Sequence, residues 1–215
     1  MNTIIVTIKD KLAIISLNRP KSNSLNREMV VELTDMLDNI SVDENIGGVI
    51  ITGKDHFFSA GLDLMELYNY NEQEAKEFWQ LFLNFTAKIT AFKKPLIAAI
   101  NGHSPAGGCV IALACDARVM AEGKYIIGLN EVPVGIIVPN SIFELYSFWL
   151  GKADAARSLL EGNLFQPEEA LAIGLVDEVV KPESILTAAE RKARKYMAYE
   201  RNTWSQSKLN IRKDL

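Results

Sequence analysis

Two runs of consecutive apolar residues place the strongest constraint on the fold of this chain. Residues 48–52 (GVIIT) and 96–100 (LIAAI) have the length of strands, contain β-branched residues and lead into glycine-bearing loops. Such runs are typical of strands that are buried on both faces. Each loop is followed by a segment with helical periodicity. This repeated strand–loop–helix order predicts a layered α/β fold, in which ligands favour the loops at the strand ends.

The segments around these two runs predict further strands and helices. Residues 3–8 and 12–17 alternate in polarity and are separated by three residues, which indicates a β-hairpin. Asn23, Ser24 and Asn26 offer N-caps to a helix whose apolar residues recur up to Ile40. We also expect helices over residues 72–92, 105–114, 139–150, 152–160, 167–173 and from Pro182 onwards, and strands over residues 125–129 and 176–180.

The bulk composition indicates one globular domain. The 215 residues fit the usual domain size of about 50–250 residues, and no linker-like tract interrupts the range 1–215. Hydrophobic residues make up 48% of the chain and charged residues 23%, as in ordinary globular proteins. The net charge of −4 lacks the basic footprint of a nucleic-acid binder, so we expect no nucleic-acid partner.

Location and metal binding are also constrained by the sequence. Residues 1–11 show no signal-peptide pattern, and no apolar run approaches the roughly 18 residues of a membrane span, so we expect a cytoplasmic protein without a membrane partner. The only histidines, His56 and His103, are too few for a His-based metal site. Cys109 and Cys115 are expected to be small core residues. The sequence therefore predicts no metal.

Two glycine-bearing loops follow the two apolar runs. The first contains Ser59-Ala60-Gly61-Leu62 at a turn that can leave the N–H of Leu62 unpaired. The second contains Pro105-Ala106-Gly107-Gly108 at the start of a predicted helix, whose N-terminus adds partial positive charge. Either loop alone is compatible with ordinary turn chemistry. As a pair, they indicate an oxyanion hole that stabilises the charge on a thioester carbonyl during α-proton removal.

Glu131 is the candidate acid/base. It is the only charged residue in the stretch 126–137, which is otherwise rich in apolar residues. Burial there would raise its pKa towards the range that is useful for accepting and returning a proton near neutral pH. The alternative is a solvated loop carboxylate, since Glu is rarely buried without a partner.

Three motifs in order are FSAGLDL (residues 58–64), NGHSPAGGCVIALACD (101–116) and IGLNEVPVGI (127–136). Together they resemble the crotonase, or enoyl-CoA hydratase/isomerase, superfamily from the first predicted hairpin to about residue 181. The resemblance implies a crotonase-like spiral of β-β-α units over about 1–181 and a C-terminal helical segment over about 182–215. It also implies a homotrimer or a dimer of trimers, and oxyanion donors at the backbone amides of Leu62 and Gly107.

The resemblance further implies an acyl-CoA thioester substrate, with CoA lying across residues 20–25 and 60–64. No metal or redox cofactor is expected, because CoA enters as part of the substrate. Asp63 has a second interpretation as the cap of the following turn. The substrate- or CoA-binding residues expected on this basis are Asn23, Leu25, Ala60, Gly61, Asp63, Leu64, Gly108 and Leu129.

Val110 distinguishes among the reactions of this family. Its hydratases carry two catalytic glutamates, and the positions that match them here are Val110 and Glu131. A single Glu suffices to move a proton from C2 to C4 of a 3-enoyl thioester, and the motifs are similar to those of the mitochondrial-type 3,2-trans-enoyl-CoA isomerases. We therefore expect an enoyl-CoA isomerase. The alternatives are enoyl-CoA hydration, decarboxylation or thioester hydrolysis, or a non-catalytic acyl-CoA-binding subunit.

Several charged and polar residues near the motifs receive structural interpretations. His56 and His103 are expected to shape their loops, and Asp116 with Arg118 to form a structural pair or to contact a neighbouring strand. The cations of residues 191–195 are expected on a solvated helix face, although one of them could reach a CoA phosphate. Relatives commonly continue for several helical turns beyond the point that matches Leu215, so either those residues are absent from this sequence or the acyl pocket closes differently.

Overall fold

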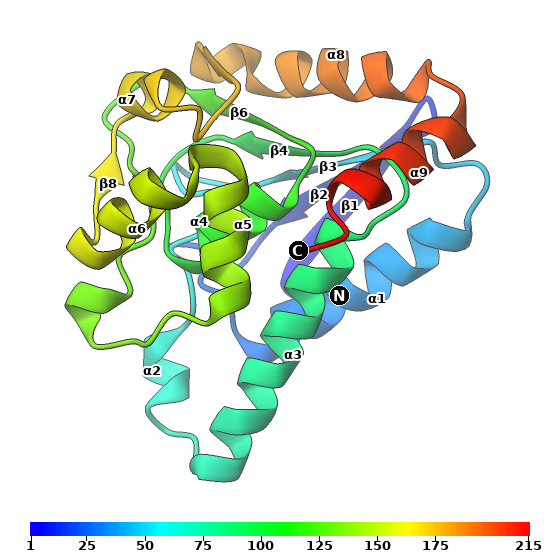
Figure 1. The fold of residues 1–215 in the computed structure, drawn as a ribbon. Helices are drawn as coiled ribbons and strands as arrows, with labels where there is room; N and C mark the ends of the chain where they lie inside the picture. The colour runs from blue at the N-terminus through cyan, green and yellow to red at the C-terminus, as the bar shows by residue number, and fades with distance from the viewer.

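The computed structural model describes all residues of the chain, Met1–Leu215. Its strands form a six-stranded sheet in the order β1-β2-β3-β4-β6-β9 and a three-stranded sheet in the order β5-β7-β8 (Figure 1). The strands are β1 Ile4–Lys9, β2 Leu12–Leu17, β3 Gly48–Thr52, β4 Leu96–Ile100, β5 Ser104–Pro105, β6 Ala117–Ala121, β7 Ile127–Gly128, β8 Leu164–Phe165 and β9 Glu178–Val180.

Nine α-helices and two short 3-10 helices connect and cover these strands. The helix that was predicted after Asn26 begins at the next residue, and the Asn26 side chain accepts a hydrogen bond from the amide of Met29. The helices are α1 Arg27–Val42, α2 Leu64–Leu67, α3 Glu72–Thr90, α4 Gly107–Ala114, η1 Val132–Val134, α5 Asn140–Leu150, α6 Lys152–Glu161, α7 Pro167–Ala172, η2 Pro182–Ser184, α8 Ile185–Met197 and α9 Arg201–Ile211.

The hairpin and the two apolar strands were predicted correctly. β1 and β2 pair antiparallel, and Asp10 and Lys11 between them both have left-handed φ values, as a tight hairpin turn requires. β2, β3, β4, β6 and β9 are parallel to one another. Every residue of β3 and of β4 is buried, which explains why these strands contain no polar alternation.

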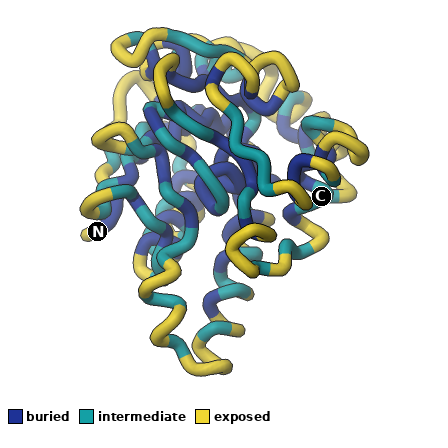
Figure 2. The backbone as a smooth tube through the Cα atoms, turned by 90° about the vertical axis from the view of Figure 1, so that its left-hand side faces the viewer, coloured by how far each residue is buried: buried dark blue, intermediate teal, exposed yellow.

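The large sheet separates two hydrophobic layers. Along β4, Leu96, Ala98 and Ile100 face the larger layer, which contains the buried residues of α1, α3, α4 and α5. Ile97 and Ala99 face the smaller layer, which is completed by α8. Figure 1 shows α8 lying across the sheet, and Figure 2 shows the buried backbone gathered at the centre of the molecule. The sheet is therefore a middle layer between helices, as the α/β prediction required.

β6 was not predicted, and its charged residue explains why. Arg118 lies in the middle of this strand, yet its side chain is fully buried. Its guanidinium donates to the Leu175 carbonyl at 2.8 Å, pairs with Asp177 at 2.9 Å and lies 3.6 Å from the ring centre of Trp149. Asp116 and Arg118 therefore do not pair with each other, because Arg118 pairs with Asp177. The alternative expectation, contact with a neighbouring strand, is confirmed, since the Asp116 carboxylate accepts from the amide of Leu96 in β4 at 2.8 Å.

The predicted strand over residues 125–129 is shorter in the structure. Only Ile127 and Gly128 form β7, between β5 and β8. A Cβ at Gly128 would lie 2.3 Å from the Asn163 carbonyl oxygen, so the close approach of β8 requires a glycine there. The last strand also begins later than expected, since β9 covers only Glu178–Val180.

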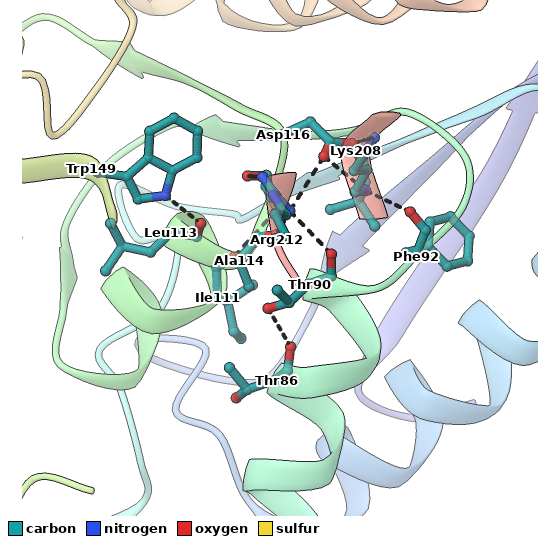
Figure 3. A network of polar contacts seen from close by, with 12 residues as sticks. Thr86, Thr90, Phe92, Ile111, Leu113, Ala114, Asp116, Trp149, Lys208 and Arg212 are labelled. Carbon is teal, nitrogen blue, oxygen red and sulfur yellow. Dashed lines mark hydrogen bonds and ion pairs between the residues drawn. The ribbon is translucent and has the colours of Figure 1, made fainter. Parts of the chain in front are cut away.

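α9 is anchored by buried cations (Figure 3). Lys208 pairs with Asp116 at 2.8 Å, and both side chains are only 6% exposed. The Arg212 guanidinium donates to the carbonyls of Ala114 and Cys115 at 2.9 and 2.8 Å. The last helix is thereby tied to the carbonyl end of α4.

The structure also addresses the membrane prediction. None of its helices combines the length and the apolar character needed to cross a lipid bilayer.

Candidate active site

The carboxyl ends of β2, β3 and β4 lie at one edge of the sheet, because these strands are parallel. The loops after β2 and β3 are joined there by backbone hydrogen bonds. The Leu25 amide donates to the Gly61 carbonyl at 2.8 Å, and the Asp63 amide donates to the Leu25 carbonyl at 2.9 Å. The segment expected to contact CoA and the first glycine-bearing loop therefore form one paired unit.

Asn23 and Ser59 hold this unit from inside. Asn23 is 2% exposed, and its side-chain amide donates to the Phe57 carbonyl at 3.0 Å while its oxygen accepts from the Arg19 amide at 3.0 Å. The fully buried Ser59 hydroxyl donates to the Asn23 carbonyl at 2.8 Å and accepts from the Gly61 amide at 3.2 Å. The Asn23 side chain is thus engaged within the protein, and any contact with CoA would have to come from the surface of this loop.

The second glycine-bearing loop leads directly into α4. Ala106 precedes the helix with φ 51° and ψ −125°, which is an uncommon backbone conformation for a residue with a Cβ. The Ala106 amide donates to the Gly128 carbonyl at 2.8 Å, which fixes this loop against β7. Gly107 then becomes the first residue of the helix. Local strain is therefore stored next to the residue predicted to supply an oxyanion donor.

The two glycine-bearing loops contact each other closely. A Cβ at Gly61 would lie 3.0 Å from the Gly107 amide nitrogen and 2.9 Å from the Ala106 Cβ, and Gly61 has a φ of 89°. The amides of Leu62 and Gly107 donate to no backbone carbonyl of the protein. Two N–H donors are therefore free at adjacent loops, and one of them lies at the positive end of α4.

These residues border a small apolar cavity of about 120 Å³. Leu62, Gly107 and Glu131 all line it, so the structure brings together the three residues predicted to be catalytic. The other lining residues are almost all without polar side-chain groups: Ala60, Leu64, Trp79, Phe82, Pro105, Ala106, Asn130, Val134, Ile136, Val138, Pro139 and Ile142.

Glu131 is the one charged residue of this lining. It is 8% exposed, and its Oε2 atom is buried without a hydrogen-bond partner. Burial raises the pKa of this carboxyl above its usual value, and hydrogen bonds from the backbone of Glu131 and Asn130 partly oppose that shift. A carboxylate without an ionic partner in an apolar cavity is costly to bury, so Glu131 is a candidate for proton transfer.

The residues expected to bind substrate or CoA divide into two groups. Ala60 and Leu64 line the cavity. The others do not line it. Gly108 has a structural role, because a Cβ there would lie 2.4 Å from the Ser59 carbonyl oxygen. These remaining residues are Asn23, Leu25, Gly61, Asp63, Gly108 and Leu129.

Asp63 acts as a cap, as one of its two interpretations stated. Its carboxylate accepts from the Glu66 amide at 3.2 Å at the start of α2. It also pairs with Arg19 at 2.6 Å. This ion pair adds a further connection between the loop after β2 and the loop after β3.

The position that carries a second glutamate in hydratases is apolar here. Val110 lies in α4 and is fully buried. No second carboxylate lines the cavity. The arrangement therefore offers one group for proton transfer and two backbone donors for a carbonyl oxygen.

Neither histidine lines the cavity, and neither does α8, the helix that carries the cations of residues 191–195. Nδ1 of His56 lies 2.9 Å from the Tyr125 hydroxyl, and the His103 ring packs edge-on against Tyr125. Both histidines thus shape the loops as expected. In α8, Arg191 pairs with Glu178 and Arg194 with Glu190, and Figure 1 shows this helix at the opposite end of the molecule from α2.

Sequence reasoning missed three residues that shape the site. Ser59 appeared only as a small residue of its motif, although its hydroxyl joins two loops. Trp79 and Phe82 read as part of the apolar face of an amphipathic helix, and only the packing of α3 places them in the cavity wall. Their spacing of three residues showed that they share one helix face, but not what that face contacts.

A larger and more open hollow of about 890 Å³ lies between α1, α3 and α9. It contains none of the residues predicted to be catalytic or to bind CoA.

Two free backbone amides and a buried carboxylate thus line one apolar cavity at the strand ends of a layered α/β fold. Enzymes that stabilise negative charge on a carbonyl oxygen use donors of this kind. The sequence profile of the enoyl-CoA hydratase/isomerase family matches residues 7–215. The chain belongs to the enoyl-CoA hydratase/isomerase family.

Individual relatives place the chain within this family. It is 40% identical over 204 residues to enoyl-CoA delta isomerase 1, mitochondrial, of Mus musculus, covering 94% of this chain and 71% of that protein. It is 35% identical over 190 residues to the crotonyl-CoA hydratase of Syntrophomonas wolfei, covering 87% and 73%. The crystal structure of human mitochondrial delta3-delta2-enoyl-CoA isomerase superposes with a TM-score of 0.96 at 34% identity, covering 99% of this chain and 84% of that one.

Proposed function

We propose that this chain is an enoyl-CoA isomerase that converts 3-enoyl-CoA to 2-trans-enoyl-CoA. The observation that carries the proposal is Glu131, the one charged residue of an apolar cavity that also contains two unpaired backbone amides. The similarity to the mouse and human isomerases supports the same reaction.

The amides of Leu62 and Gly107 would bind the thioester carbonyl oxygen. As the C2 proton leaves, negative charge develops on this oxygen, and the two N–H groups stabilise it more strongly than they stabilise the neutral carbonyl. The N-terminus of α4 adds its partial positive charge at Gly107. The apolar lining strengthens both effects because little water screens them.

Glu131 would move the proton. Its carboxylate takes the proton from C2, and the electrons of the C–H bond form a C1–C2 double bond while the carbonyl oxygen takes the negative charge. The C3–C4 double bond is still in place in this dienolate. The dienolate then receives the proton at C4 from the same carboxyl group, which returns to its charged form. When C4 is protonated, the carbonyl re-forms, the C2–C3 double bond forms and the C3–C4 bond becomes single. A pKa raised by burial suits this cycle, because the group must be a base in one step and an acid in the next.

The cavity favours isomerisation over the other reactions considered. Hydration in this family relies on a second glutamate, whereas the matching position here is the buried Val110. Decarboxylation would require a place for the substrate carboxylate, and no cationic side chain lines the cavity. A non-catalytic binder would gain nothing from burying an unpaired Glu131, which lowers stability.

Product analysis tests this proposal. Purified protein is incubated with 3-hexenoyl-CoA, and the conjugated 2-trans product, the water adduct and free CoA are quantified together. We expect the conjugated product to dominate at early times. Predominance of the 3-hydroxyacyl adduct or of free CoA would assign the chain to hydration or hydrolysis instead. Glu122→Gln, at an exposed position outside the cavity, serves as a control for loss of a carboxylate.

Assembly, location and cofactor use are further parts of this proposal. We propose a homotrimer or a dimer of trimers formed by a single domain over residues 1–215, and the mass in solution tests the assembly. The cytoplasmic location is the prediction from sequence, and two of the relatives named above are mitochondrial by name, so fractionation of the source cells decides between the compartments. The proposed reaction transfers no electrons, and activity that survives exhaustive chelation would support the absence of a metal.

A further inference from the structure

Large side chains from α3 and α5 line one wall of the cavity. Trp79 and Phe82 come from α3, and Ile142 comes from the first turns of α5. Phe82 is 1% exposed, whereas Trp79 is only partly buried. Their rings pack edge-on with centroids 6.4 Å apart. Trp79 is therefore the outer member of the wall that the acyl chain would meet.

The volume of the cavity limits what it can hold. It measures about 120 Å³. A water molecule occupies about 30 Å³ in the liquid, and an apolar cavity of about 150 Å³ in another protein accommodates benzene, with its six carbons. The space beside Glu131 therefore accommodates a short hydrocarbon chain, and a longer one would need Trp79 to move.

The chemistry of the wall limits the substrate as well. None of Trp79, Phe82 and Ile142 carries a charge, and Glu131 is the one charged residue of the cavity lining. A carboxylate or a hydroxyl group at the far end of the acyl chain would lose its hydration there without gaining a charged partner. The wall therefore fits an unsubstituted hydrocarbon end.

We propose that this chain acts on short, unsubstituted 3-enoyl thioesters of about four to six acyl carbons, and that Trp79 is the residue that sets the length limit. This inference rests on the proposed isomerase function for the identity of the reaction, but the length limit itself is a property of the cavity. The cavity also has apolar residues at the protein surface, because Leu64 and Val134 line it and are 37% and 52% exposed. A longer chain that is given room by removal of the Trp79 ring would therefore meet further apolar side chains.

The test compares 3-enoyl-CoA substrates of four to twelve carbons in the wild type and in Trp79→Ala. We expect wild-type kcat/KM to fall by at least about tenfold between six and ten carbons, since poorly fitting methylenes cost about that much in a closed pocket. In Trp79→Ala, kcat/KM for the ten-carbon substrate should rise to near its value for the six-carbon substrate. Trp79→Leu, a milder change, should shift the limit less and provides the result if the alanine variant folds poorly.

Leu83→Ala is the matched control. Leu83 is a partly buried residue of the same helix that packs against the core without lining the cavity. The Leu83→Ala variant should retain the wild-type dependence of kcat/KM on acyl chain length even if the protein becomes less stable. A wild-type profile that is flat or rises with chain length would overturn the inference, as would equal profiles in the Trp79 and Leu83 variants.

Binding separates this inference from the proposed function. The affinities of saturated acyl-CoA thioesters of the same lengths are measured by calorimetry, which requires no turnover. A preference for short chains that Trp79→Ala abolishes supports the length limit even if no isomerisation occurs, in which case only the proposed reaction fails. Isomerisation without any length preference in binding or turnover contradicts the length limit alone.

Discussion

At the residue scale, the burial of Glu131 has a consequence for stability. Loss of solvation raises the pKa of this carboxyl in the folded protein. At pH values between the pKa of the unfolded state and that of the folded state, the folded protein therefore binds more protons than the unfolded one. Stability from this group is therefore present below the unfolded value of about 4.3 and falls as pH rises through the folded value.

Glu131→Gln should remove this dependence. We expect a higher melting temperature than wild type at pH 8, because the variant carries no unpaired buried charge, and nearly equal melting temperatures at pH 4. Thermal unfolding at both pH values measures the difference. An equal stability difference at the two pH values would show that the carboxylate is not destabilised in the folded protein.

Ser59 joins two loops of the site, so its hydroxyl should affect catalysis. Ser59→Ala leaves the Asn23 carbonyl and the Gly61 amide without their partner, at a cost of about 1–3 kcal/mol in the free energy of unfolding. We expect kcat to fall, because the neighbouring Leu62 amide becomes less well positioned. Ser41→Ala, on the exposed end of α1, is the control, and urea unfolding with steady-state kinetics provides the readouts. Unchanged kcat in a destabilised Ser59→Ala would limit Ser59 to a structural role.

The candidate residues differed in how far the sequence could predict them. Glu131 stood out because a lone charge in an apolar stretch is a local pattern. Leu62 and Gly107 were harder, since a free backbone amide is a property of the folded loops and only their composition and the family resemblance pointed to it. Trp79 was missed because its contacts come from distant segments that local periodicity does not describe.

At the element scale, α9 depends on a buried cluster of charges (Figure 3). Lys208 and Asp116 are each 6% exposed, and Arg212 lies 3.4 Å from the same carboxylate. Removing one partner of such a pair leaves a buried charge poorly compensated. The cluster also lies at the carbonyl end of α4, whose other end carries Gly107.

Lys208→Met should therefore destabilise the protein by about 3–5 kcal/mol, because Asp116 loses its nearest cation. Adding Asp116→Asn should recover part of that loss, and a double-mutant cycle by urea unfolding measures the coupling. Lys192→Met, on the partly solvated α8, is the matched control and should change stability little. A loss below about 0.5 kcal/mol in Lys208→Met would show that this ion pair does not anchor the helix.

Strands were predicted correctly where their residues are all buried or alternate between buried and exposed. β3 and β4 have the predicted bounds, since five-residue apolar runs between loops leave few alternatives. β6 escaped prediction because Arg118 interrupts its apolar pattern, and its charge is compensated by Asp177 from a distant part of the chain. β7 was overestimated because its length is set by the approach of β8, which local sequence does not specify.

At the scale of the whole molecule, the proposed chemistry and the largest core share one side of the sheet. The layer of α1, α3, α4 and α5 contains the cavity residues Phe82 and Ile142. The opposite face is covered by α8 and contributes no residue to the cavity. The fold thus supports the free amides and Glu131 with packed helices, which keeps their positions fixed during proton transfer.

The most direct measurement follows loss of deuterium from C2 of a labelled 3-enoyl-CoA, together with the affinity for the same thioester. Wild-type protein should release or transfer the label during isomerisation, whereas Glu131→Gln should lose at least about a hundredfold in this rate while binding the thioester nearly as tightly. Label loss at the wild-type rate in Glu131→Gln would contradict the single-carboxylate mechanism.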